Sequence, residues 1–120
     1  IFSNEVVTDH IIAGGVNKVY IFDHLSRTIS TSYRKVFVSA QIKTDSEGRL
    51  RILDNGDAFV EEQNFGRILR VSADAVRWTY VNRIDDGSVG FLNWSRYLYR
   101  SEIVEFLESL KNAECGVAAG

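Results

Sequence analysis

Asn55-Gly56 lies between two extended runs in residues 48–62, "GRLRILDNGDAFVEE", and no other short stretch limits the fold of this chain so strongly. An Asn-Gly pair readily adopts the positive φ angles of a tight hairpin turn. The run before it alternates between basic and apolar residues: Arg49 and Arg51 against Leu50 and Ile52. The sequence therefore predicts an antiparallel hairpin with one basic face and one apolar face.

Three more stretches predict strands, because β-branched and aromatic residues dominate them or alternate with polar ones. They are residues 16–25, 33–43 and 65–71. Within 33–43 the alternation predicts a buried face and an outer face: Val36, Val38, Ala40 and Ile42 against Tyr33, Lys35 and Phe37. Residues 72–84 are open between a helix capped by Ser72 and a strand, and "VRWTYV" favours the strand.

Aromatic and basic residues crowd residues 90–100, "GFLNWSRYLYR", which we also expect to be a strand. Its alternation predicts that Leu92, Trp94 and Leu98 pack inward, with Tyr97 and Tyr99 on the opposite side. Arg96 shares the inward face, so we expect it at a sheet edge or paired with an acid such as Glu102 or Glu105.

A C-terminal helix follows, in which Ser101 caps "EIVEFLESLKNA". Its apolar stripe consists of Ile103, Phe106, Leu107 and Leu110. Several strands and one helix predict an α+β fold, a curved, largely antiparallel β-sheet or partly open barrel with this amphipathic helix packed on it. We expect one globular domain over residues 1–111 and a flexible tail at 112–120.

Composition narrows the functional classes. The chain has 120 residues, a net charge of −2 and 45% hydrophobic residues, values typical of an ordinary folded domain. No apolar run is long enough for a membrane span. The single cysteine, Cys115, excludes an internal disulfide framework and a multi-cysteine metal site, and it favours a reducing intracellular compartment.

Candidate catalytic groups are few. His10 and His24 each follow an aspartate, but neighbouring residues on a strand point to opposite faces, so neither pair forms a dyad through adjacency alone. We therefore expect no catalytic residues, no metal and no cofactor. A small enzyme with a site near His10 and His24 is the minority alternative.

Arginines and aromatic residues on the extended segments are the better candidates for a binding surface. Such residues interleaved on a sheet face can stack bases and hold phosphates, as single-stranded nucleic acid requires. The candidates are Tyr33, Lys35, Phe37, Arg49, Arg51, Arg67, Arg70, Arg77, Tyr97, Tyr99 and Arg100.

Residues 34–53, "RKVFVSAQIKTDSEGRLRIL", resemble the strand-turn-strand core of a PUR repeat. The segment "SEIVEFLESL" is similar to the helix that closes a PUR or whirly-type unit. This resemblance implies a curved four-stranded sheet backed by one helix, assembly as dimers or paired repeats, and binding of single-stranded DNA or RNA on the sheet face. It implicates Lys35, Phe37, Arg49 and Arg51.

The sequence thus predicts a non-catalytic module that binds single-stranded nucleic acid. The alternative is a protein-interaction domain with a pleckstrin-homology-like barrel, because tyrosine, tryptophan and arginine are also enriched at protein interfaces. Either module could form a homo-oligomer.

Overall fold

The computed structural model describes residues 2–3, 15–45 and 47–111. His10, Cys115 and the tail predicted at 112–120 lie outside these residues. The elements, in chain order, are β1 (Phe2–Ser3), β2 (Lys18–Val19), β3 (Ile21–Asp23), β4 (Thr28–Ser30), α1 (Arg34–Ser39), β5 (Gly48–Ile52), β6 (Ala58–Glu62), the 3-10 helix η1 (Gln63–Phe65), β7 (Arg67–Val71), β8 (Val76–Val81) and α2 (Arg100–Lys111).

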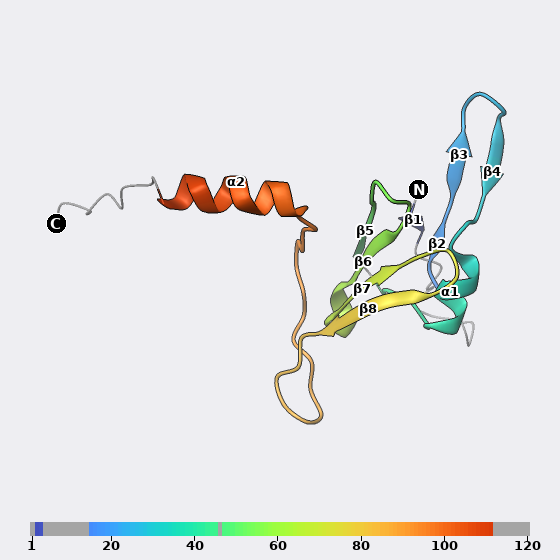
Figure 1. Ribbon diagram of the computed structural model, residues 1–120. Helices are drawn as coiled ribbons and strands as arrows, with labels where there is room; N and C mark the ends of the chain where they lie inside the picture. Colours follow the sequence, from blue (N-terminus) through green and yellow to red (C-terminus); the bar gives the residue numbers. More distant parts are fainter. Residues whose placement is uncertain (1, 4–14, 46, 112–120) are drawn as a thin grey trace.

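A four-stranded antiparallel sheet in the order β5-β6-β7-β8 forms the centre of the molecule (Figure 1). The hairpin predicted at 48–62 is confirmed: β5 pairs with β6, and Gly56 takes a φ of 79° in the turn between them. The strand predicted at 65–71 is confirmed as β7, and the ambiguous stretch 72–84 contains β8. Residues 16–25 form two short strands, β2 and β3, each in a two-stranded sheet of its own.

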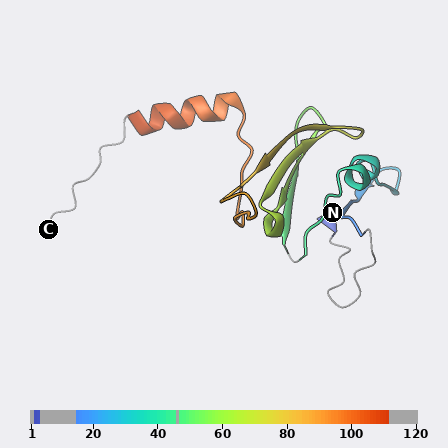
Figure 2. The same cartoon turned by 90° about the horizontal axis from the view of Figure 1, so that it is seen from below.

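The hydrophobic core lies between one face of this sheet and the segment that carries α1. In Figure 2, α1 is on one side of the sheet, and the chain leading to α2 is on the other. The core residues from both layers are Val16, Val19, Tyr33, Val36, Phe37, Ile42, Ala58, Val60, Leu69 and Val71. Leu50 packs against them, as the alternation in the first hairpin arm predicts.

Residues 34–39 form the helix α1, so the strand predicted at 33–43 is wrong. Tyr33, Val36 and Phe37 are buried together with the partly buried Ala40. These residues are spaced as i, i+3, i+4 and i+7, which is one face of a helix. Phe37 and Tyr33 therefore belong to the core, and the Tyr33 hydroxyl donates a hydrogen bond to the Gly56 carbonyl at 2.6 Å.

The strand predicted at 90–100 is also wrong. Residues 91–99 contain no regular strand and cross the sheet face opposite α1 as an extended segment, which we call the strap. Trp94 has a φ of 62°, a left-handed conformation that interrupts an extended path. Trp94 is 68% exposed and Leu98 is 44% exposed, so neither packs inward as predicted.

α2 begins at Arg100 with the predicted apolar stripe, but no residue of it is buried. The helix points away from the sheet instead of packing on it (Figures 1 and 2). The Glu102 carboxylate accepts a hydrogen bond from the Tyr99 N–H at 2.6 Å and so closes the first turn. The α+β class is confirmed, and the four-stranded sheet is not closed into a barrel.

Within the described ranges, no helix has both the length and the apolar character that a bilayer crossing would need.

Candidate binding cleft between the sheet and the strap

Two rows of side chains lie across the sheet face that the strap covers. The register aligns Arg49 with Glu61, Ile68 and Tyr80 in one row, and Arg51 with Phe59, Arg70 and Trp78 in the next. Residues in register across antiparallel strands project from the same face. The basic face predicted for the first hairpin arm therefore continues into a mixed basic and aromatic surface.

Three hydrogen bonds join the strap to β5, β6 and the turn between these strands. The Ser95 N–H donates to the buried Glu61 carboxylate at 2.5 Å. The Arg51 guanidinium donates to the Tyr97 carbonyl at 3.0 Å. At the end of the strap, the Tyr99 hydroxyl accepts the N–H of Asp54 at 2.8 Å. The strap is thus held to β5, β6 and their connecting turn by side chains instead of a strand ladder.

An aromatic cluster fills the space beneath the strap. Phe59, which is 5% exposed, makes edge-to-face contacts with Trp78 at a centroid distance of 6.3 Å and with Tyr97 at 5.7 Å. The Tyr97 ring meets Tyr99 at 5.4 Å, also edge-to-face. Centroid distances of about 4.5–7 Å are the favourable range for such pairs.

Guanidinium groups stack on the strap aromatics. Arg49 lies over the Trp94 ring at 4.6 Å, and Arg51 lies over the Tyr99 ring at 5.5 Å. Arginine side chains held in this way keep most of their five N–H donors for other partners.

A cleft of about 390 Å³ opens between β5, β6 and the strap, and we call it the strap cleft. Its volume lies within the usual range for ligand sites. Arginines, aromatic and aliphatic side chains, one serine and one glutamate line it: Arg49, Leu50, Arg51, Phe59, Ser95, Arg96, Tyr97, Leu98 and Glu102. Arg96 and Glu102, one of the two acids predicted as its partner, thus border the same cleft.

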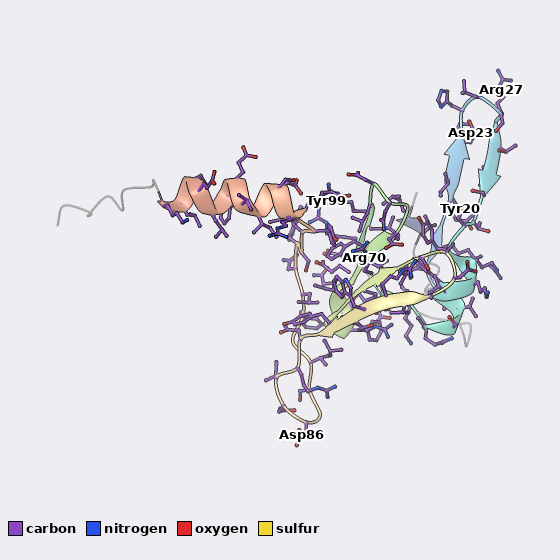
Figure 3. The ribbon with its side chains drawn as sticks, in the orientation of Figure 1. Tyr20, Asp23, Arg27, Arg70, Asp86 and Tyr99 are labelled. Atoms are coloured by element: carbon purple, nitrogen blue, oxygen red, sulfur yellow. The ribbon has the colours of Figure 1, made fainter. Side chains whose placement is uncertain are left out.

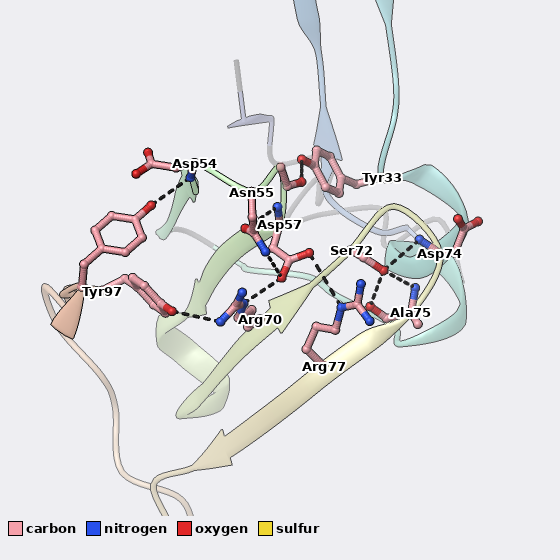
Figure 4. Close-up of polar contacts among 12 residues, drawn as sticks. Tyr33, Asp54, Asn55, Asp57, Arg70, Ser72, Asp74, Ala75, Arg77 and Tyr97 are labelled. Carbon is pink, nitrogen blue, oxygen red and sulfur yellow. Dashed lines mark hydrogen bonds and ion pairs between the residues drawn. The ribbon is translucent and has the colours of Figure 1, made fainter.

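Asp57 organises the far side of the aromatic cluster (Figure 4). Arg70 donates to its carboxylate at 2.8 Å and to the Tyr97 hydroxyl at 2.9 Å. Arg77 lies 3.7 Å from the other carboxylate oxygen. The hydrogen bond from the Asn55 side chain, followed by the two arginines, lowers the pKa of Asp57 below its ordinary value, although partial burial opposes the shift. The Arg70 guanidinium therefore connects the Asp57 carboxylate with the Tyr97 hydroxyl.

The structure brings five of the predicted binding residues together at the strap: Arg49, Arg51, Arg70, Tyr97 and Tyr99. It does not bring the others there. Tyr33 and Phe37 are core residues, and Lys35 pairs with Asp74 at 3.2 Å near α1.

The three remaining predicted arginines have other positions. Arg67 is bound to the buried Glu62 and to the carbonyls of Ala40 and Gln41 on the α1 side. Arg77 lies beside Asp57, and Arg100 begins α2.

The sequence did not predict Phe59 and Arg96 as cleft residues, or Trp94 as the ring on which Arg49 stacks. Phe59 alternates with the buried Val60 on β6, and only the pairing with Arg51 reveals that it lies under the strap. Trp94 and Arg96 were assigned to the inward face of a strand that does not form. The density of aromatic and basic residues in 90–100 was the available signal, and it coincides with the strap.

Among the residues that the structure describes, no group of three or more histidine, cysteine, aspartate or glutamate side chains is placed to hold a metal ion. His24 is exposed in the connection between β3 and β4.

Comparison of the chain with family models, with curated proteins and with solved structures finds no match.

Proposed function

We propose that this chain is a non-catalytic module that binds a short stretch of single-stranded nucleic acid in the strap cleft. The observation that carries the proposal is one cleft lined by three arginines, Arg49, Arg51 and Arg96, of which the first two also stack on aromatic rings of the strap. Of the residues that the resemblance to PUR-type modules implicates, Arg49 and Arg51 of β5 line this cleft, whereas Lys35 and Phe37 belong to the helix α1.

Charge supports an anionic ligand. Against the three arginines, the lining contains one carboxylate, that of Glu102, which already accepts the Tyr99 N–H. Arg51 donates one N–H to the Tyr97 carbonyl, so the rest of its fork can reach a phosphate.

Trp94 supports a base-stacking role. Its ring is 68% exposed, and Arg49 lies over it, so base, indole and guanidinium groups can stack together. Bases of any sequence have such a flat face, so we expect weak sequence preference and strong salt dependence.

Fluorescence anisotropy of labelled single-stranded DNA and RNA, at several salt concentrations, tests the proposal. We expect Trp94→Ala to weaken binding by roughly 1–3 kcal/mol, the range for a lost base stack. Arg49→Gln and Arg96→Gln should each weaken binding and reduce the slope of log K against log salt by about 0.7 if each arginine contacts one phosphate.

Arg34→Gln is the matched control, because Arg34 is also an exposed arginine but belongs to α1 on the opposite side of the sheet. It should bind like the parent. Absence of binding at low salt, or equal losses in the Arg34 and Arg49 variants, would contradict a site in the strap cleft.

A second candidate is a protein-interaction module, and the exposed apolar stripe of α2 favours it. An apolar interface should respond to salt much less than nucleic-acid binding does. The salt series therefore separates the two candidates.

A further inference from the structure

We propose that the strap cleft binds the phosphorylated end of a single strand, a terminal nucleotide with a phosphomonoester, in preference to nucleotides within the strand. This inference rests on the proposed function and specifies which part of the nucleic acid the cleft takes. The charge of the cleft, its arginines without acidic partners and its size support a strand end.

The charged side chains that line the cleft leave an excess of positive charge. Three arginines line it against one carboxylate, that of Glu102. The buried Glu61 carboxylate accepts the Ser95 N–H and is not part of the lining. A phosphate inside a strand carries one negative charge, whereas a terminal phosphomonoester carries about −1.5 to −2 at pH 7. The terminal group therefore matches the charge of the cleft better.

The arginines of the cleft are not neutralised by acids of the chain. In the part of the chain that the structure describes, Arg49, Arg51 and Arg96 form no ion pair. Arg67 and Arg70, by contrast, are each paired with a buried acid. Guanidinium groups bind phosphates strongly, through charge-assisted hydrogen bonds. The three cleft arginines are therefore available to an anionic ligand.

Two elements bring these arginines to one cleft. Arg49 and Arg51 are two positions apart on β5, so they project from the same face, and Arg96 comes from the strap. Stacking on Trp94 and on Tyr99 orients the two β5 guanidinium groups. A phosphomonoester has three acceptor oxygens, one more than an internal phosphate has free. It can therefore accept hydrogen bonds from more of these groups at once.

The size and the aromatic lining of the cleft fit a terminal nucleotide better than a free phosphate. Its volume of about 390 Å³ is near the lower end of the range for small-ligand sites, and a phosphate alone would leave most of it empty. The rings of Phe59 and Tyr97 line it beside the arginines. Such rings offer contact to the base or the sugar that carries the phosphate.

The start of α2 borders the cleft with a negative charge. Glu102 lies in the first turn of α2, lines the cleft, and accepts the Tyr99 N–H at 2.6 Å. Figure 3 shows Tyr99 where the strap meets α2. A carboxylate held there repels the phosphates of a strand that continues past it. We therefore expect a strand that ends in the cleft to bind better than one that runs through it.

Binding of short oligothymidylates of equal length tests the proposal. The linear strands carry a 5′-phosphate, a 3′-phosphate or only hydroxyl ends, and a circular strand has no end. We expect one of the phosphorylated strands to bind roughly tenfold tighter, or more, than the hydroxyl and circular strands, because its terminal phosphate adds charge-assisted hydrogen bonds. Comparison of the 5′ and 3′ forms identifies which end the cleft takes.

Arg96→Gln tests whether the cleft causes this preference. It removes one guanidinium of the lining, so we expect the ratio of the affinities for phosphorylated and hydroxyl strands to fall by roughly fivefold or more. Arg83→Gln is the matched control, because Arg83 is an exposed arginine that follows β8, at the opposite edge of the sheet from β5. This variant should keep the ratio of the parent.

Three results would overturn the inference while leaving the proposed function intact. They are equal binding of the phosphorylated and circular strands, an unchanged ratio in Arg96→Gln, and a phosphorylated end that binds no tighter than a hydroxyl end. Thymidine monophosphate and inorganic phosphate serve as competitors. If either displaces the phosphorylated strand as well as that strand displaces itself, the cleft takes a free phosphate group and the inference is wrong. Absence of binding by every strand at low salt would overturn the proposed function as well.

Discussion

Glu62 is a carboxylate with no exposed side-chain surface at the end of β6. The Lys43 N–H donates to it at 2.6 Å, and Arg67 donates to both of its oxygens. Arg67 also donates to the carbonyls of Ala40 and Gln41, so this ion pair ties the sheet to the segment after α1. Replacing one partner of a buried, hydrogen-bonded ion pair strongly destabilises a fold, because the other charge stays buried without its counterion.

Glu62→Gln should therefore lower the free energy of unfolding by about 2–3 kcal/mol, because Arg67 loses its counterion while remaining mostly covered. Urea denaturation measures the change. Glu105→Gln, on exposed α2, should change stability by less than about 0.5 kcal/mol. Equal effects of the two substitutions would show that the buried pair contributes nothing specific.

The ionisation of Asp57 makes the free energy of unfolding depend on pH in the acid range. Its pKa is lowered in the folded protein, mainly by the Asn55 hydrogen bond and then by Arg70 and Arg77. The ionised carboxylate therefore stabilises the fold above its unfolded pKa of about 3.9, and this contribution is lost as pH falls through the lower folded value.

The thermal midpoint of the parent should accordingly exceed that of Asp57→Asn at neutral pH, and the difference should shrink as pH falls below about 4. Thermal unfolding followed by circular dichroism across this range tests the prediction. A difference that is constant with pH would mean that the ionisation of Asp57 does not stabilise the fold.

At the scale of elements, two glycines in the connections between strands have different surroundings. Gly56 and Gly66 have φ angles of 79° and 55°, which strain any other L residue. Around Gly56 there is open space, whereas a Cβ on Gly66 would collide with the Gly90 carbonyl oxygen of the loop after β8. The turn after η1 therefore fits only glycine for two reasons.

Gly56→Ala should cost about 1–2 kcal/mol of stability, the strain of a left-handed residue. Gly66→Ala should lower stability by the same amount and by about 1–3 kcal/mol more, because the loop that carries Gly90 must also move. Urea denaturation of the two variants compares the costs directly. If Gly66→Ala costs no more than Gly56→Ala, the close approach of Gly90 is not a constraint.

At the scale of the whole molecule, the chain is open. Its radius of gyration is 18.0 Å, against roughly 14 Å for a compact domain of this length. α2 projects on one side, and the β3–β4 hairpin, with Asp23 and Arg27 near its tip, projects on the other (Figure 3). All residues from Ile21 to Ser30 are exposed.

Amide hydrogen exchange should measure how stable α2 is on the exposed side of the molecule. We expect little protection of the α2 amides, because a helix of 12 residues with no buried side chain unfolds readily. Amides of β6 and β7, inside the sheet, should be protected much more strongly. Equal protection of α2 and of these two strands would contradict this expectation.

Local sequence signals determined the elements whose residues and turns agree. Asn55-Gly56 and the alternation around it specified the hairpin of β5 and β6, and the helical spacing of Ile103, Phe106, Leu107 and Leu110 specified α2. Crowding of aromatic and basic residues in 90–100 marked the strap region. In these cases the conformation depends on residues only a few positions apart.

Tertiary structure decided the rest. The stretch around Val36 and Phe37 fits a strand by alternation and a helix by the spacing of Tyr33, Val36, Phe37 and Ala40, and burial against the sheet selects the helix. The strap has a strand-like composition but binds the sheet through Ser95, Tyr97 and Tyr99.

The direction of α2 was equally beyond the sequence. An apolar stripe requires a covering surface, but it does not say whether that surface belongs to the same chain. The strap, held at Asp54 by Tyr99, sets where α2 begins and turns it away from its own sheet. Such long-range contacts depend on the whole arrangement of the core and leave no local pattern in the chain.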